Sequence, residues 1–252
     1  MHGYKRRLSR FRENETGRIL LLNLEHGLSE GFIPGLEDVL GLLSKAGQEL
    51  VSGVILNKGW MHYHPLAVPG KQNLVLSLSS GTKHGLPHYS RAMVCSVQEA
   101  LRHGADAVCV HINIGNDLED RMLMDLGAVT DESRQAGLPV LATVGARGGQ
   151  IVNEFDPSLV AHCIRLGVEM GADMIQVPHC RDTQVFSRAV ASSPAPVLVS
   201  GGPRWTDFRA FLDMVRQSLE CGAQGICVGR NVFQQEDPGQ ALDEVAQVVF
   251  GK

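Results

Sequence analysis

The sequence predicts a single (β/α)8 barrel, an α/β fold in which eight parallel strands alternate with helices. Its clearest signal is a junction that occurs three times, HGAD at 103–106, MGAD at 170–173 and CGAQ at 221–224, each followed by a short apolar run. Glycine suits the left-handed position after a helix, and a short apolar run between turn residues is typical of a strand buried on both faces. Each junction therefore predicts the end of a helix and the start of a strand.

Two further phrases, LPVL at 138–141 and APVL at 195–198, place proline at the entry of a strand, where the first residue need not donate a hydrogen bond. The predicted strands are 18–24, 53–56, 73–78, 107–113, 140–144, 174–177, 197–200 and 225–228. Segments with helical periodicity between them include 96–102, 118–135, 158–169, 208–220 and 241–249. Eight such strands over about 250 residues fit a (β/α)8 barrel, whereas a doubly wound sheet leaves some of them unexplained.

Length and composition agree with one domain. The 252 residues are 44% hydrophobic and 20% charged, which is ordinary for a soluble globular protein with a sizeable core. No linker, charge run or change of composition divides the chain. We therefore assign residues 17–252 to the barrel and residues 1–16 to an N-terminal extension that we expect to cover the bottom of the barrel.

Charge, apolar runs and cysteine spacing predict which partners and which cellular location the protein has. The formal net charge is −4 and the basic residues are dispersed, so nucleic acid is not expected as a partner, because binding phosphates requires a basic face. The longest apolar run near the N-terminus, 19–22, has only the length of a strand, so we predict neither membrane association nor a signal peptide, and a cytoplasmic location. Six cysteines without CxxC spacing indicate reduced core thiols.

In a (β/α)8 barrel the active site lies at the C-terminal ends of the strands, so the fold selects candidate residues before any chemistry is assumed. After the first four predicted strands these are Glu25, His26, Gly27, Lys58, Gly59, His62, His64, Ser79, Ser80, Lys83, His111 and Asn113. After the last four they are Arg147, Gly148, Gln176, His179, Ser200, Gly201, Gly202, Gly229, Arg230 and Asn231.

The loops after the seventh and eighth predicted strands indicate a phosphate site. Gly201 and Gly202 follow one strand, and Gly229 and Arg230 follow the next. Barrels often bind phosphate at this place with free backbone N–H groups. Tight turns alone would also explain the glycines, but both loops carry the feature and Arg230 adds positive charge. We therefore predict a phosphorylated small-molecule substrate.

Several phrases resemble the class I aldolases of archaeal fructose-bisphosphate aldolase type. They are LEHGLSEGFIPGL, SVQEALRHGADAV, VHINIGND, PAPVLVSGG and GAQGICVGRNVFQ, and the resemblance runs from about residue 16 to 249. Relatives in this family include aminodideoxyheptulosonate synthases and a thiolase acting on a phosphorylated autoinducer breakdown product. The resemblance implies a barrel that assembles into a homo-oligomer and acts on phosphorylated keto compounds. It assigns the phosphate to Ser200, Gly201, Gly202, Gly229 and Arg230.

The catalytic positions depart from the family. Its Schiff-base lysine lies in the phrase GADIVKT, where this chain has Gln176, and an amide nitrogen cannot form an imine. Its proton-transferring tyrosine lies two residues before Arg-Gly, which places Gly145 there, ahead of Arg147. The acidic residue of its Asp-His-Gly phrase is Glu25 here. We therefore predict a mechanism that does not use the usual lysine imine.

Other groups offer alternatives. Lys58 is a candidate Schiff-base amine, although relatives that keep the usual lysine often carry a similar Lys-Gly phrase, which favours a role in substrate charge or structure. A zinc or manganese site is a second alternative, with possible ligands Glu25, His62, His64, His111 and His179. The favoured interpretation makes Glu25, His111 and His179 acid–base groups. We predict no metal and no cofactor, and no GxGxxG follows a strand.

Three functional hypotheses follow. The first is an aldolase-family lyase or transferase that acts on a phosphorylated keto substrate without the lysine imine, forming or rearranging carbon–carbon or carbon–nitrogen bonds in a specialised biosynthetic pathway. The second is a true aldolase that uses Lys58 or a metal. The third is a non-catalytic barrel that binds a phosphorylated metabolite or partners an active paralogue. Polar groups at Glu25, Lys58, His111 and Arg147 favour an enzyme, because buried charge is costly to keep.

Overall fold

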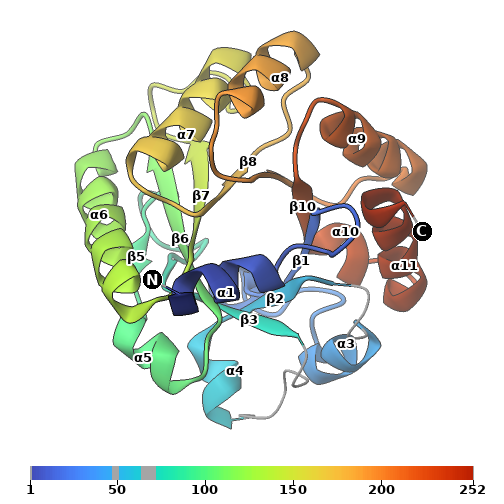
Figure 1. The fold of residues 1–252 in the computed structure, drawn as a ribbon, viewed down its shortest axis with the longest axis horizontal. Coiled ribbons are helices and arrows are strands. Elements are labelled where there is room, and N and C mark those ends of the chain that lie inside the picture. Colours follow the sequence, from blue (N-terminus) through green and yellow to red (C-terminus); the bar gives the residue numbers. More distant parts are fainter. Residues whose placement is uncertain (1, 47–50, 64–71, 252) are drawn as a thin grey trace.

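Eight parallel strands close into a barrel in the computed structural model, which describes residues 2–46, 51–63 and 72–251 (Figure 1). Around the barrel the order is β1 (Ile19–Asn23), β10 (Gly225–Val228), β9 (Val197–Ser200), β8 (Met174–Val177), β7 (Val140–Ala146), β6 (Ala107–Ile114), β3 (Asn73–Ser77) and β2 (Gly53–Leu56). The predicted (β/α)8 barrel is confirmed, and every predicted strand ends within about two residues of its observed bounds.

Helices surround the barrel (Figure 1). They are α2 (His26–Glu30), α3 (Val39–Lys45), α4 (Lys58–Tyr63), α5 (Val97–Arg102), α6 (Glu119–Ala136), α7 (Pro157–Glu169), α8 (Thr183–Ala191), α9 (Phe208–Glu220), α10 (Arg230–Phe233) and α11 (Pro238–Phe250). The five predicted helices correspond to α5, α6, α7, α9 and α11. Side chains that accept hydrogen bonds from the first turn start several helices, for example Asp156 before α7 and Asp207 before α9.

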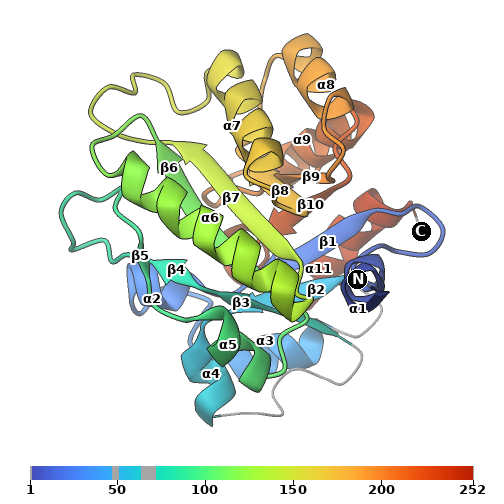
Figure 2. The ribbon, with the colours of Figure 1, turned by 60° about the vertical axis from the view of Figure 1, so that its left-hand side comes forward.

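A small antiparallel hairpin follows β3 and was not predicted. Its strands are β4 (Ser79–Ser80) and β5 (Ala92–Met93), with Ser79 opposite Met93 and Ser80 opposite Ala92. Strands of two residues are too short to show alternation in a sequence. The hairpin lies beside β3 and brings the start of β5 to the C-terminal end of the barrel (Figure 2).

The recurring junction has a structural reason that goes beyond the glycine. Its three glycines, Gly104, Gly171 and Gly222, all have positive φ, as predicted for a helix end. The polar residue two positions later accepts a hydrogen bond from an N–H in the first two residues of a neighbouring strand: Asp106 from Leu74 (3.0 Å), Asp173 from Val140 (2.9 Å) and Gln224 from Val197 (2.7 Å). The motif therefore ends a helix and fixes the start of an adjacent strand.

The N-terminal helix α1 (His2–Arg10) lies across the end of the barrel from which the strands start (Figures 1 and 2). Phe11, directly after it, is fully buried in a cluster with inward-facing residues such as Leu21, Val75 and Met174. Arg10 forms a salt bridge of 3.0 Å with Asp106 at the same end. The opposite end of the barrel remains open to a ligand. In the described part of the chain no helix is both long and apolar enough to span a bilayer.

Candidate active site

A cavity of about 110 Å³ opens at the C-terminal end of the barrel, and we call it the mouth cavity. Its polar lining consists of Arg91, His111, Asn113, Thr143, Arg147, Glu154, Gln176 and Ser200. Five of the candidate residues, His111, Asn113, Arg147, Gln176 and Ser200, therefore meet in one place. They come from β6, β7, β8 and β9, so the cavity is built from strand ends, as in other barrels of this class.

Glu25 follows β1 and reaches His111 on β6, although β2 and β3 lie between these strands in the barrel. Its Oε1 lies 3.1 Å from His111 Nε2, and the two side chains are 12% and 21% exposed. Asn23 holds the carboxylate, because its Nδ2 donates to the same Oε1 (2.7 Å) while its Oδ1 accepts the Glu25 N–H (2.9 Å). We call Glu25 and His111 the acid–base pair.

The acid–base pair holds a negative charge next to His111, which lines the mouth cavity. Burial by itself would raise the pKa of Glu25, but the charge and hydrogen bond of His111, with hydrogen bonds from Ser77 and Asn23, lower it to about 2. Glu25 is therefore ionised at physiological pH. His111 Nδ1 is buried and has no hydrogen-bond partner among the described residues, so one ring nitrogen of the imidazole makes no hydrogen bond there.

The β7 and β8 side of the mouth cavity carries neutral groups. Gln176, only 4% exposed, accepts a hydrogen bond at Oε1 from Thr143 Oγ1 (3.2 Å). Because that contact occupies the amide oxygen, the amide N–H groups of Gln176 are left to donate into the cavity. At Gly145 an added Cβ would meet only Asn113 Oδ1, at 3.8 Å, so the position has ordinary room for a side chain that the sequence does not supply.

Asn231 joins the two loops predicted to bind phosphate. This side chain is fully buried, and its Nδ2 donates to the carbonyl oxygens of Gly201 (2.8 Å) and Pro203 (3.0 Å). Its Oδ1 accepts the Trp205 N–H (2.8 Å). The loop after β9 and the loop after β10 are thus held at a fixed separation before any ligand arrives.

Close packing shapes the loop after β10. A Cβ added to Gly229 would lie 2.6 Å from His26 Cε1 and 2.8 Å from the Asn23 carbonyl oxygen, so only glycine fits there. Arg230 lies 3.5 Å from Glu30, and its Nε is buried without a hydrogen-bond partner in the described part of the chain. Burial lowers the pKa of His26, and its Nδ1 is likewise unpartnered. Buried polar atoms without partners are rare, and here two of them belong to Arg230 and to His26, whose ring packs against Gly229.

Comparison with known proteins agrees with this geometry. The sequence profile of the DeoC/LacD family aldolases matches residues 19–235. A Streptomyces griseus protein, 2-amino-4,5-dihydroxy-6-oxo-7-(phosphonooxy)heptanoate synthase, is 33% identical over 96% of this chain and 89% of its own length. The class 1 fructose-bisphosphate aldolase of Thermoproteus tenax is 34% identical over 93% of this chain and 90% of its own length.

The chain belongs to the DeoC/LacD family of aldolases. This confirms the predicted family, and with it an aldolase-family enzyme. The crystal structure of an archaeal fructose 1,6-bisphosphate aldolase superposes with a TM-score of 0.90 at 32% identity, covering 99% of this chain and all of that one. A second archaeal aldolase structure, with its catalytic Lys covalently bound to the carbinolamine intermediate of the substrate, has a TM-score of 0.87 at 32% identity and covers 98% and 100% of the two chains.

Two other predicted catalytic residues of this aldolase-family chain lie outside the mouth cavity. Lys58, at the start of α4, forms a salt bridge of 3.1 Å with Glu99 of α5. His179 follows β8, and its Nδ1 lies 3.2 Å from Ser218 Oγ on α9. Burial and the charge of Arg181 lower the pKa of His179. Both side chains therefore contact the helix layer, whereas Glu25, His111, Arg147 and Gln176 lie at the mouth.

The residues considered for a metal are not brought together in the described structure. His62 is exposed and packs edge-on against Tyr63, and His64 lies outside the described residues. Glu25 and His111 pair with each other. Across residues 2–46, 51–63 and 72–251, no three His, Cys, Asp or Glu side chains are grouped as metal ligands.

Several residues of the candidate site were missed by sequence reasoning. Arg91 and Thr143 line the mouth cavity, and Ser77 and Asn23 support Glu25. Thr143 and Ser77 are polar residues at inward positions of mostly apolar strands, which is the signal that could have identified them. Arg91 has no such signal, because it belongs to the unpredicted hairpin.

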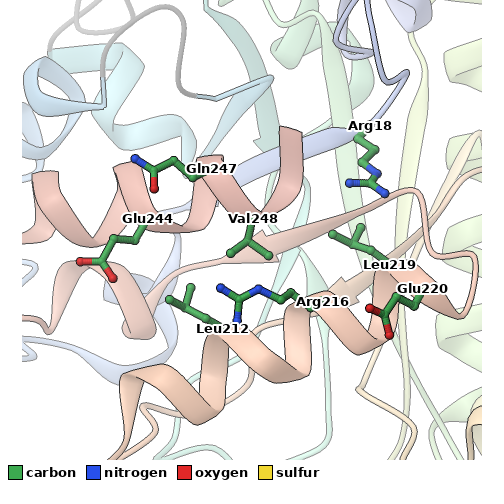
Figure 3. A pocket seen from close by; sticks show the side chains of 8 residues that line it. All are labelled: Arg18, Leu212, Arg216, Leu219, Glu220, Glu244, Gln247 and Val248. Carbon is green, nitrogen blue, oxygen red and sulfur yellow. The ribbon is translucent and has the colours of Figure 1, made fainter. Parts of the chain in front are cut away.

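A separate groove of about 420 Å³ lies between α9 and α11 (Figure 3). Leu212, Arg216 and Leu219 line it from α9, and Gln247 and Val248 line it from α11. Arg18, at the start of β1, closes one end and donates to the Val249 carbonyl oxygen (2.8 Å). The groove lies on the helix layer towards the strand starts, so it is not where the chemistry of this aldolase fold occurs.

Proposed function

We propose that this enzyme acts on a phosphorylated keto substrate, which it binds through the loops after β9 and β10, and that the acid–base pair moves a proton at the carbon next to the keto group. The compound for which the Streptomyces griseus synthase is named carries an oxo and a phosphonooxy group, and the Thermoproteus tenax relative is a fructose-bisphosphate aldolase. These relatives support a phosphorylated substrate. The acid–base pair is the single observation that carries the chemistry.

The proposed phosphate site is supported by hydrogen-bond donors that have no partner in the described part of the chain. Gly202 and Gly229 present backbone without side-chain bulk, and Asn231 holds their loops together. Val232 and Phe233 donate their N–H groups to the Gly229 carbonyl oxygen (2.8 and 3.0 Å). The N–H groups that come before them at the start of α10 therefore have no carbonyl acceptor within that helix. Those N–H groups and Arg230 Nε are donors suited to an anion.

Gln176 takes the place of the Schiff-base lysine in the proposed mechanism. An amide cannot form an imine, but its N–H groups can donate to the keto oxygen. When the acid–base pair removes the proton from the adjacent carbon, the proton passes to the unpartnered Nδ1 of His111, and the C–H electron pair moves into an enolate. The enolate oxygen then accepts hydrogen bonds from Gln176, because stabilising charge as it develops lowers the barrier. The resulting carbanion equivalent is ready to form a new bond to carbon or nitrogen.

The proposal can be tested without knowing the compound to which the enolate forms its new bond. Incubation with dihydroxyacetone phosphate in D₂O should exchange a proton next to the keto group for deuterium, which NMR detects. Treatment with borohydride under the same conditions should trap no covalent adduct, as followed by intact-protein mass spectrometry. Exchange that depends on Glu25 without a trapped adduct supports the proposed mechanism.

Other outcomes separate the alternatives. An adduct that maps to Lys58 would show a true aldolase with a relocated amine, and loss of exchange on chelation would show a metal. No exchange, combined with phosphate-dependent binding, would support a non-catalytic barrel. The Lys58–Glu99 salt bridge argues against the first of these, because an amine held as a paired ammonium is not nucleophilic.

A further inference from the structure

Gly145 leaves a space on the inner face of β7 that neither the backbone nor the packing requires. It lies in the regular pairing of β7 with β6, opposite Asn113, and its φ is not positive. Among the described residues, an added Cβ would meet Asn113 Oδ1 at 3.8 Å and nothing closer, whereas the same change at Gly229 would clash. Glycine within a strand costs stability, and it often marks a place where a ligand approaches closely. The space at Gly145 is therefore available to part of a ligand.

This space lies next to the proposed reacting groups, on the side of the open mouth. His111 of β6 pairs with Thr143 of β7, which pairs with Gln176 of β8. Asn113 and Gly145 pair with each other two residues further along β6 and β7. Residues two apart on a strand face the same side and are separated by about 6.6 Å. The first three residues therefore form one inward layer, and Asn113 with Gly145 forms part of the next layer towards the mouth; all five line the mouth cavity.

Asn113 presents a hydrogen-bond acceptor to the space at Gly145. Its side chain is only 6% exposed, and its Nδ2 donates to the Tyr89 carbonyl oxygen (2.6 Å). That contact fixes which way the amide is turned, because a carbonyl oxygen can only accept. Oδ1 is then directed to Gly145, and it accepts no hydrogen bond from the described residues. A mostly buried acceptor of this kind is stabilised by a donor that a ligand brings.

The charges around the mouth cavity favour an uncharged donor. Glu154, a carboxylate on the cavity wall, is already paired with Arg147 at 3.2 Å. Burial and the charge of Arg147 lower the pKa of Arg91, and the charge of Glu25 opposes this. An ammonium group on a ligand would have to compete with these arginines for the carboxylates. A hydroxyl group needs only the neutral acceptor of Asn113.

We propose that Gly145 and Asn113 form a specificity subsite for a hydroxyl-bearing carbon of the substrate, on the side of the keto group away from the phosphate. The carbon occupies the space at Gly145, and its hydroxyl donates to Asn113 Oδ1. The pair thus selects a hydroxylated chain over an apolar one of the same length. This inference rests on the proposed function for the place of the keto group, and it adds the residues that select what lies beyond it.

The experiment compares two phosphorylated ketones by calorimetry. They are erythrulose 1-phosphate and 1-hydroxybutan-2-one phosphate, which lacks the hydroxyls on the two carbons beyond the keto group. Wild-type protein should bind erythrulose 1-phosphate roughly three- to tenfold more tightly, the effect of one net hydrogen bond. Equal affinity, or a preference for the compound without the hydroxyls, would overturn the proposal.

Two substitutions at Gly145 differ from each other by one hydroxyl. Gly145→Ser places a hydroxyl one bond beyond the new Cβ, within reach of Asn113 Oδ1, so it should occupy the acceptor and remove the preference. Gly145→Ala is the matched control: it narrows the space by the same Cβ but leaves the acceptor free, so the preference should persist. Equal preferences in these two variants would contradict the proposal.

Asn113→Ala tests the acceptor directly. It removes Oδ1, so the preference for erythrulose 1-phosphate should disappear. A preference that survives this substitution would overturn the assignment to Asn113. Thermal unfolding of each variant shows whether it is folded, which matters most here because the contact with the Tyr89 carbonyl oxygen is also lost.

Failure of the inference differs from failure of the proposed function. Erythrulose and 1-hydroxybutan-2-one repeat the comparison without any phosphate, by NMR titration. A preference for erythrulose that Gly145→Ser removes and Gly145→Ala keeps would support the subsite even if the phosphate loops proved not to bind phosphate. Deuterium exchange that depends on Glu25, without any hydroxyl preference, would support the proposed function and refute the subsite.

Discussion

Two carboxylates at opposite ends of the barrel have pKa values shifted in opposite directions. At the mouth, burial opposes ionisation of Glu25, but His111, Ser77 and Asn23 lower its pKa to about 2. At the bottom, burial raises the pKa of Asp173 to about 6, and the hydrogen bond from Val140 N–H only partly opposes that rise. Burial acts in the same direction at both ends, so the partners decide the outcome.

The difference agrees with the proposed catalytic role of Glu25 and with a structural role of Asp173. Asp173 belongs to the recurring junction and fixes the start of β7, a task that one backbone hydrogen bond fulfils. Glu25 is surrounded by side chains from β1, β3 and β6 that serve its charge. A buried carboxylate held by side chains from three strands costs desolvation and side-chain order, which is the pattern expected where chemistry requires it.

The largest expected effect follows from removing the charge at the mouth. Glu25→Gln should slow deuterium exchange into dihydroxyacetone phosphate by about 10²–10⁴-fold, the usual contribution of a positioned acid–base group. NMR measures the exchange rate. Asp173→Asn is the matched control at the other end and should leave the rate unchanged. Equal losses in the two variants would mean that the comparison reflects stability alone.

The phosphate loops should show the next effect. Arg230→Ala should weaken binding of dihydroxyacetone phosphate by about 1.5–3 kcal/mol, the range for hydrogen bonds to charged groups. Calorimetry measures the affinity, with Arg216→Ala in the groove of Figure 3 as the control. Loss of affinity for dihydroxyacetone, which has no phosphate, would contradict the assignment of Arg230 to the phosphate.

The lowered pKa of Glu25 should make the protein less stable as the pH falls. Because the pKa of Glu25 falls from 4.5 to about 2 on folding, its contribution is complete above the unfolded value and is lost as the pH falls towards 2. The difference in unfolding temperature between the wild type and Glu25→Gln should therefore shrink by several degrees between pH 6 and pH 2.5. Thermal unfolding followed by circular dichroism measures it. A constant difference would show that the ionised form is not the one stabilised.

Asp173 should give the smallest effect, with the opposite sign. Its pKa rises from 3.8 to about 6 on folding, so its contribution is most favourable below pH 3.8 and is lost as the pH rises through 6. Asp173→Asn keeps an acceptor for Val140 N–H. The difference in unfolding temperature between this variant and the wild type should therefore be a few degrees more favourable to the variant at pH 7 than at pH 4. Asp106→Asn, which removes the salt bridge with Arg10, should show no such gain.

The sequence by itself determined the barrel and most of its strand bounds, because glycine at a helix end, proline at a strand entry and apolar runs act over a few residues. It also determined which strand ends carry polar groups, and so placed Glu25, His111, Arg147, Gln176 and the phosphate loops at one end. The polar residues of the recurring junction were visible in the sequence as a repeat. The strand that each of them fixes could not be identified there, because the hydrogen-bond partner is about 30 residues away.

Only the tertiary structure decided which of the candidates meet. Lys58 and Glu25 both follow strand ends, yet the direction of each side chain depends on packing: Lys58 pairs with Glu99 in the helix layer, and Glu25 turns inward to His111. Arg91 reaches the mouth through a hairpin of two-residue strands, too short to leave a periodic signal. Side-chain direction and contacts between distant segments follow from the closure of the barrel, which no local pattern encodes.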